Sequence, residues 1–375
     1  MKFSVSSLTL TNRLAALGRV ISTKNNNIPI LGAILFEIKG NDLHLTGSDG
    51  ETTLVTSIEL ISSEGDCRFA ISAKTIQDAL KEIPEQPLTF DLNADTLEID
   101  VLYQNGKYHL IGQNADEYPI FQRLDNNANS FTIPSNLLLS SLTRALFAAM
   151  DDDMHPVMNG VYFDMVPHGI TIVATDGRIM VCTKSPLANQ DKTANFILHK
   201  KPSTLLKSLL GKEENDIVIR FNERNASVEM EDYRMDCRLI EGRYPNYNSV
   251  IPTDNPNHVT INRVTMLSAL RRIMVFSDPT TALVKIQLSP NEIALSSQAI
   301  DFSQSAEENV VCDYAGASMS IGFKGTYLID ILNNLTGNDV IIKLGDPSRA
   351  GVIVPAEQDE NQNILMLIMP LMLNE

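Results

Sequence analysis

The feature that most constrains this fold is an internal repeat of roughly 125 residues. A short strand leading into an amphipathic helix recurs with spacings of 128 residues, at Phe3, Phe131 and Val259. A second strand and helix follow half a repeat later, at Phe69, Phe196 and Ile321. Near the end of each repeat a proline follows an aromatic or apolar residue, as in Tyr118-Pro119, Tyr244-Pro245 and Met369-Pro370. Units of this length are too long for a solenoid, so each is expected to form a domain with its own core.

Each repeat has the pattern of an α+β domain. The amphipathic segments predict two helices per repeat, over residues 8–20, 74–83, 135–149, 200–212, 262–275 and 324–335. Runs such as 44–60 alternate apolar and polar residues around Gly, Asn and Pro, which is typical of antiparallel strands. Two helices are too few to cover both faces of a parallel sheet. Polar linkers predict three domains, 1–127, 128–252 and 253–375.

Charge is segregated by predicted secondary structure. The chain carries a formal charge of −16, yet the predicted helices hold thirteen basic and only three acidic residues. Solvated helix faces usually mix signs, because opposite charges at i,i+4 add stability. A sparse basic face without interleaved aromatics favours loose, sequence-independent contact with phosphates. Lys24, which follows the first predicted helix, and twelve of the thirteen basic helix residues are predicted to face nucleic acid: Arg13, Arg19, Lys74, Lys81, Arg144, Lys200, Lys201, Lys207, Arg263, Arg271, Arg272 and Lys324.

One cluster has the chemistry of a metal site. Asp151, Asp152 and Asp153 precede His155, and these are ligand types that Mg²⁺ or Mn²⁺ accepts. An acidic loop after a helix is more often solvated, so no metal is predicted. Asp49 and Asp176 stand in equivalent SDG and TDG turns without a counterpart in the third repeat, which predicts turn caps rather than catalysts. Because the sequence has no phosphate loop, GxSxG elbow or HExxH motif, we predict neither an active site nor a cofactor.

Cysteine usage and hydropathy predict a soluble, cytoplasmic protein without a membrane partner. The four cysteines are widely spaced, which favours free thiols in a reducing compartment. The N-terminus lacks the apolar core of a signal peptide. The longest apolar run, 364–369, is too short to span a bilayer.

The chain resembles the bacterial DNA sliding clamp family, the beta subunit of the replicative DNA polymerase III holoenzyme. The resemblance covers the whole chain and rests on the order and spacing of short segments: MKFSV at the start, IPILG at 28–32, LTGSD at 45–49, MNG at 158–160, VATDGR at 173–178, EGRYPNY at 241–247, IGF at 321–323 and MPL at 369–371. It implies three clamp domains and a head-to-tail homodimeric ring around duplex DNA. The implied function is a non-catalytic processivity factor.

The resemblance also implies a hydrophobic pocket for short peptide motifs. Its partners would be the polymerase III catalytic subunit, the clamp loader, other polymerases and repair factors. The residues predicted to form it are His155, Met158, Thr175, Gly177, Arg178, Ile179, Pro245, Val250, Leu367, Ile368, Met369, Pro370, Leu371 and Met372, and all of them except His155 and Met372 match the family. The chain departs from the family where Arg178 directly follows Gly177, where His155 and Ser249 replace frequent arginines, and where Met372 replaces a terminal arginine. These departures imply a shifted peptide preference.

Two further expectations concern surfaces. The implied dimer interface places Tyr108 and Leu110 of an edge strand against Val275 and Phe276 at a helix end of the second chain. Pro370 lacks an amide hydrogen and should end the last strand. The residues after it are therefore expected to form an apolar segment without a core to enter.

Two alternatives to the clamp stay open at this point. One is a metal-dependent hydrolase or nuclease that uses Asp151–Asp153 and His155. The other is a repeat scaffold that binds only proteins.

Overall fold

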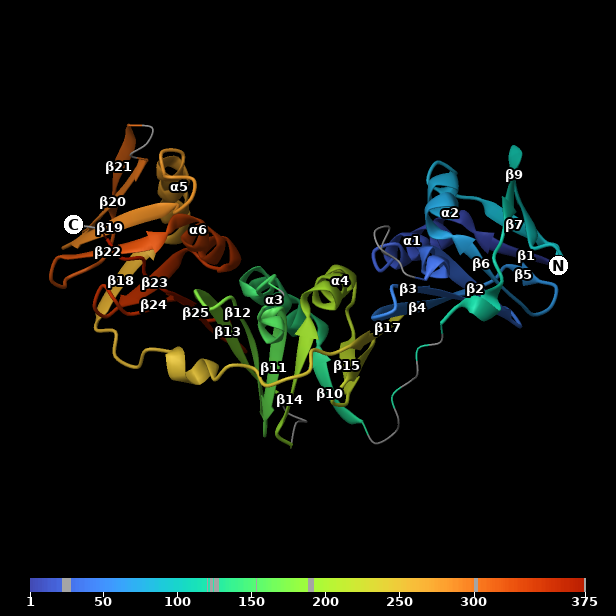
Figure 1. The fold of residues 1–375 in the computed structure, drawn as a ribbon, viewed down its shortest axis with the longest axis horizontal. Coiled ribbons are helices and arrows are strands. Elements are labelled where there is room, and N and C mark those ends of the chain that lie inside the picture. The colour runs from blue at the N-terminus through green and yellow to red at the C-terminus, as the bar shows by residue number, and fades with distance from the viewer. Residues whose placement is uncertain are drawn as a thin grey trace. The chain divides into compact units, whose positions relative to one another are not determined.

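The computed structural model describes residues 1–21, 28–119, 121, 124, 128–152, 154–187, 192–299 and 303–373. All six predicted helices are present (Figure 1): α1 (Ser7–Leu17), α2 (Ala73–Leu80), α3 (Ser135–Ala145), α4 (Lys200–Leu210), α5 (Arg263–Met274) and α6 (Gly325–Asn334). Each ends earlier than the sequence predicts, and α3 continues into a 3-10 turn at Leu146–Ala148.

Capping side chains explain where helices α1, α2 and α5 begin. Ser6, Ser72 and Asn262 each accept a hydrogen bond from the backbone N–H three residues further on. Such caps satisfy an amide that the first helical turn leaves unpaired. In α1 the apolar positions Leu10, Leu14 and Leu17 then fall on one face and are fully buried. In these segments of the first and third repeats, the local sequence therefore specifies a strand followed by a capped amphipathic helix.

The chain divides into two compact units, and the first comprises residues 1–138 and 204–239. It holds two antiparallel sheets. The five-stranded sheet has the order β5 (Ser62–Ser63), β1 (Lys2–Ser6), β7 (Pro87–Leu92), β8 (Glu98–Tyr103), β9 (Gly106–Ile111). The eight-stranded sheet has the order β10 (Asn129–Pro134), β15 (Asp216–Phe221), β16 (Asn225–Glu229), β17 (Tyr233–Arg238), β4 (Thr52–Glu59), β3 (Asp42–Ser48), β2 (Ala33–Lys39), β6 (Cys67–Ser72).

Aromatic side chains form the core where these sheets meet. The rings of Phe3 and Phe90 stack at 4.8 Å, and those of Phe36 and Phe69 at 5.2 Å. Helix α1 packs on β3 and β4, while α2 packs on β2 and β6, so the two helices lie side by side (Figure 1). Their outward faces remain available to solvent.

The second unit comprises residues 139–203 and 240–375. Its eight-stranded sheet has the order β14 (Ala194–His199), β11 (Gly160–Val166), β12 (Gly169–Thr175), β13 (Ile179–Pro186), β25 (Asn363–Ile368), β24 (Gly351–Pro355), β23 (Asp339–Leu344), β18 (Asn257–Asn262). Its four-stranded sheet has the order β21 (Gln304–Val311), β20 (Glu292–Ala299), β19 (Leu283–Ser289), β22 (Met319–Lys324). Helices α5 and α6 lie side by side against this smaller sheet.

Sheets continue from one repeat into the next. β4 of the first repeat pairs with β17 of the second, and Leu54 lies opposite Met235 with both side chains fully buried. β13 of the second repeat pairs with β25 of the third in the same antiparallel way. The sequence did not predict these joins, because alternation identifies the buried face of a strand but not its neighbour. The domain boundaries at 127 and 252 stay a prediction.

Two further observations concern the class of protein. In the described residues, no helix is both long and apolar enough to cross a membrane. The predicted free thiols are confirmed for all four cysteines. Burial raises the pKa of the Cys182 thiol to about 11, so this thiol is protonated and unreactive at neutral pH.

Candidate functional site

The TDG turn between β12 and β13 is a tightly hydrogen-bonded element. Asp176 Oδ1 accepts from the backbone N–H groups of Arg178 and Ile179, both at 2.8 Å. Thr175 Oγ1 donates to the carbonyl of Ile179 at 2.6 Å. Gly177 has φ +82°, a conformation that side chains with a Cβ rarely adopt. The predicted turn-capping role is confirmed for Asp176, and Asp49 makes the equivalent bonds in the first repeat.

A tyrosine that the sequence analysis missed supports this turn from the third repeat. The hydroxyl of Tyr327 on α6 donates to Asp176 Oδ2 at 2.8 Å. Burial, and then the neighbouring Asp176 carboxylate, raise the pKa of Tyr327. The Lys324 ammonium lies 4.9 Å from the centre of the Tyr327 ring. Nothing local marks Tyr327, because its partner is 151 residues away in the chain.

The tail, residues 369–373, is held on both sides of Pro370. Strand β25 ends at Ile368, where the proline was expected to stop it. The Met369 N–H donates to the carbonyl of Arg178, and the Leu371 N–H donates to the carbonyl of Gly322, both at 2.8 Å. The expectation of a segment with nothing to enter is therefore wrong, since Leu371 bridges to β22. The side chains of Met369 and Met372 are 42% and 78% exposed, so the tail still offers an apolar surface.

The fourteen predicted pocket residues all lie in the second unit, but they differ in exposure. Ile179, Leu367 and Ile368 are buried and serve the core. Exposed or half-buried positions are His155, Met158, Thr175, Gly177, Arg178, Pro245, Val250, Met369, Pro370, Leu371 and Met372. The exposed ones and the tail therefore supply the surface that a ligand could meet.

Backbone pairing joins the TDG turn directly to the last strand and the tail. Ile179 pairs with Ile368 at the end of β25, and one residue further along the chain the Met369 N–H donates to the carbonyl of Arg178. For His155 and Met158 the contacts are local, since the Met158 N–H donates to the His155 carbonyl.

Stacked tyrosines fix the segment that carries Pro245. The rings of Tyr162 and Tyr244 stack at 4.5 Å, and the Tyr247 hydroxyl donates to Asp164 Oδ2 at 2.7 Å. Tyr244 and Tyr247 belong to one buried cluster with Leu367 of the last strand. The 244–247 segment is thus rigidly attached to the strand that precedes the tail.

The acidic loop is a surface turn in the part that the structure describes. Asp152 accepts from the backbone N–H of Met154, and its Oδ2 lies 3.4 Å from His155 Nδ1. The bond from Met154, and then that from His155, lower the pKa of Asp152. Asp153 lies outside the described residues. Among those described, no three His, Cys, Asp or Glu side chains are grouped to hold a metal ion.

The predicted DNA-facing cations fall into three sets. Exposed on or near helices are Arg19, Lys74, Lys81 and Lys201, with Lys207 half-buried. Others bind protein partners: Arg13 with Asp232, Arg272 with Glu308, Arg271 with Asn333, Arg263 with the carbonyls of Leu332 and Gly337, Lys200 with the carbonyl of Ala149, and Lys324 with the Tyr327 ring. Lys24 lies outside the described residues.

Arg144 forms the third set, and its predicted role is wrong. Its side chain is 5% exposed and donates to Gln362 Oε1 and Asp359 Oδ2. Arg144 lies beside the apolar face of α3. A side chain in that position is exposed only if no other segment packs against that side of the helix. Here the loop before β25 packs there and supplies both partners.

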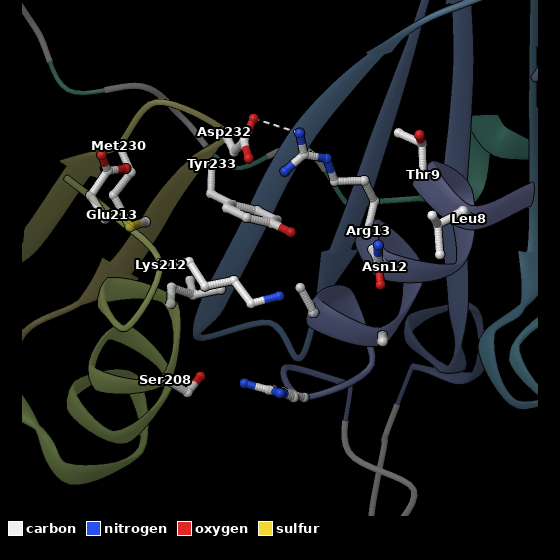
Figure 2. Close-up of a pocket in the computed structure, with 14 residues that line it drawn as sticks. Leu8, Thr9, Asn12, Arg13, Ser208, Lys212, Glu213, Met230, Asp232 and Tyr233 are labelled. Carbon is white, nitrogen blue, oxygen red and sulfur yellow. Dashed lines mark hydrogen bonds and ion pairs between the residues drawn. The ribbon is translucent and has the colours of Figure 1, made fainter. Parts of the chain in front are cut away.

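A cavity of about 380 Å³ lies in the first unit between α1 and the segments around α4 and β17 (Figure 2). Arg13 reaches across to Asp232, and its guanidinium carbon lies 5.0 Å from the centre of the Tyr233 ring. The hydrogen bond from Arg13 lowers the pKa of Asp232. Lys212 points its ammonium into the same space.

The residues predicted for a dimer interface are accessible. Val275 and Phe276, just after α5, are 74% and 39% exposed. Tyr108 and Leu110 on β9 are half-buried. Ile111 and Val311, which end β9 and β21, are also exposed, at 72% and 82%, and the sequence analysis did not single them out. Their position at strand ends hid them, because a single apolar residue there carries no periodicity.

Comparison with known proteins decides what this assembly of elements is. Family models of the DNA polymerase III beta subunit match in three parts: the N-terminal domain at residues 1–122, the central domain at 132–246 and the C-terminal domain at 248–372. The chain belongs to the DNA polymerase III beta subunit family. The family comprises the beta sliding clamps, processivity factors of DNA replication, and so the predicted family, fold class and function are confirmed.

Individual relatives match along nearly the whole chain. The beta sliding clamp of Haemophilus influenzae is 29% identical over 372 residues, which cover 98% of this chain and 99% of that protein. The beta sliding clamp of Escherichia coli is 24% identical, with 92% and 93% covered. A crystal structure of the Pseudomonas aeruginosa clamp bound to griselimycin superposes with a TM-score of 0.94 at 22% identity, and both chains are fully covered.

Proposed function

We propose that two copies of this sliding-clamp chain close a head-to-tail ring, and that each junction between copies repeats the junctions within the chain. The carrying observation is the pair of equivalent strand joins, β4 with β17 and β13 with β25. In each, the strand after the SDG or TDG turn pairs with the last strand of the next repeat.

The same rule leaves two strands without partners. In the third repeat the equivalent of β4 and β13 is β21, and in the first repeat the equivalent of β17 and β25 is β9. In the described sheets, β21 and β9 are both edge strands. An exposed strand edge is a template for pairing with another chain. β21 of one copy would therefore pair with β9 of the second, twice per ring.

Encirclement explains how an acidic protein can serve DNA. Topological linkage needs no tight site, so helices with few cations suffice, and sparse phosphate contacts let the ring slide. In this proposal the ring has no catalytic residue and no cofactor. It acts by holding a polymerase on duplex DNA, and its cytoplasmic location remains a prediction.

Partner proteins would dock at the tail. In this proposal the exposed Met369 and Met372 and Pro245 would supply an apolar surface and the TDG turn part of its polar rim, an arrangement typical of partner sites. Flexible methionines suit several different peptides. We therefore propose the polymerase catalytic subunit, the clamp loader and repair factors as ligands that carry short peptide motifs.

The ring proposal is tested by oligomeric mass. Phe276→Asp places a charge at the expected junction, so light scattering should report folded monomers in place of dimers. The matched control is Val264→Asp, since Val264 is 53% exposed on the same α5 helix and lies outside the proposed interface. A dimer that survives Phe276→Asp, or dissociates equally with both variants, would sink the assignment.

A further inference from the structure

We propose that the cavity between α1 and the end of α4 binds an unpaired nucleotide of a DNA strand. This goes beyond encirclement of duplex DNA, and it rests on the proposed function only in taking α1 to face the nucleic acid. The cavity measures about 380 Å³, within the usual range of ligand sites. A phosphate alone would fill little of it, whereas a whole nucleotide has a comparable size.

The charge of the cavity favours an anion. Arg13, Arg19 and Lys212 line it, opposed by Asp232 and Glu213. Asp232 is bound by Arg13, and the two carboxylate oxygens of Glu213 accept from the backbone N–H groups of Asn215 and Glu231. Within the described part of the chain, the side chains of Arg19 and Lys212 form no hydrogen bond or ion pair. Two cations are therefore left for a ligand, and both acids are already satisfied.

The remaining walls suit a base and a sugar. Leu8, Leu209 and Met230 supply apolar surface, and the Tyr233 ring with Arg13 stacked over it closes one side (Figure 2). Thr9 and Asn12 add groups that can hydrogen-bond to base edges. Basic residues beside apolar and aromatic surface are the usual means of binding single strands without sequence preference. Bases in a duplex are stacked and paired, so only an unpaired nucleotide could enter.

Binding of a fluorescent oligothymidylate of about six nucleotides, a length typical of such sites, tests the proposal by anisotropy. Arg19→Ala combined with Lys212→Ala should weaken binding at least tenfold. The salt slope should fall by about 1.4, because each phosphate contact on single strands contributes about 0.7. Lys39→Ala with Lys285→Ala removes the same charge from exposed strand positions that do not line the cavity and should leave binding unchanged.

A third variant should act in the opposite direction. Asp232→Asn frees Arg13 from its ion pair and adds a cation to the cavity, so oligothymidylate binding should tighten. A polyglutamate peptide should not displace the oligonucleotide, since it offers charge without a base.

The proposal is overturned if the wild-type chain does not bind the oligonucleotide, if the Arg19 and Lys212 double variant binds normally, or if the control pair weakens binding equally. Efficient displacement by polyglutamate would also overturn it, in favour of a general anion site. Retention on circular duplex is measured in parallel with each variant. If the wild type is retained on the circle but does not bind the oligonucleotide, this inference alone fails, whereas a wild type that is not retained on the circle overturns the proposed function.

Discussion

At the scale of single residues, hydrogen-bond partners decide which cations of this clamp are accessible to DNA. Arg144 was expected to meet DNA, yet a carboxylate and a buried amide from a distant loop bind it. The sequence could not show this, because Asp359 and Gln362 lie more than 200 residues further along the chain. The turn-capping role of Asp176 was predicted correctly, since it depends on the two amides that follow within three residues, whereas the bond from Tyr327 was missed. Local hydrogen bonds are predictable from sequence, and long-range ones are not.

We expect Asp359→Ala to lower the free energy of unfolding by about 2 kcal/mol, since it removes a charge-assisted bond from a buried guanidinium. The free energy of unfolding is measured by urea denaturation of this variant and of a control variant. The control is Glu51→Ala, whose ion-pair partner Arg238 is 65% exposed, and this variant should cost less than about 0.5 kcal/mol. Equal costs for the two variants would show that the Arg144 network contributes nothing special.

Tyr327→Phe should weaken the binding of a partner peptide roughly fivefold, corresponding to about 1 kcal/mol for one hydrogen bond. The lost hydroxyl no longer holds Asp176, and the TDG turn loosens. The resemblance to the clamp family implies partner peptides with a glutamine and a hydrophobic pair, and a fluorescent peptide of this kind reports the affinity. Tyr314→Phe removes a hydroxyl bonded to Ala317 and Asn257 elsewhere in the same repeat and should have no effect. Unchanged affinity in Tyr327→Phe would remove Tyr327 from the site.

At the scale of elements, the helices and strands follow their local sequence closely, whereas their neighbours do not. Each helix was placed by its apolar period and its preceding strand, and α1, α2 and α5 begin at side-chain caps. The two strand pairings between repeats were missed, because β4 and β17 lie some 180 residues apart and nothing in either sequence indicates which strand it pairs with. The tail was half predicted. β25 ends before Pro370, as predicted. Leu371 then forms a β-bridge with Gly322, and these two residues come close only in the folded third repeat.

Gly322→Val should displace the tail without unfolding the repeat. A Cβ at this position would lie 2.8 Å from the Leu371 carbonyl oxygen and 2.9 Å from Leu373 Cδ2, so the tail must move. We expect dimerisation and the thermal transition to persist while peptide binding is lost, as it should be in a chain lacking residues 370–375. Peptide binding at wild-type affinity by either folded variant would exclude the tail as the partner site.

For the whole molecule, the repeat explains both the architecture and its use. Two joins between three repeats leave β9 and β21 as edge strands. In the proposed ring, each of the two copies would pair its β21 with the β9 of the other. The length of the repeat and the basic helices were readable from the sequence. The interface was only partly readable, since Ile111 and Val311 acquire meaning once β9 and β21 are known to be edges.

The most direct test of the account is the retention of the chain on circular and on linear duplex DNA. After loading onto a nicked circle, the protein should remain bound for many minutes at a salt concentration that abolishes simple phosphate contacts. Cutting the circle once should release it, because a ring held only by topology slides off the ends, and Phe276→Asp should not be retained on either form. Equal release from circular and linear DNA would contradict encirclement and with it the central claim.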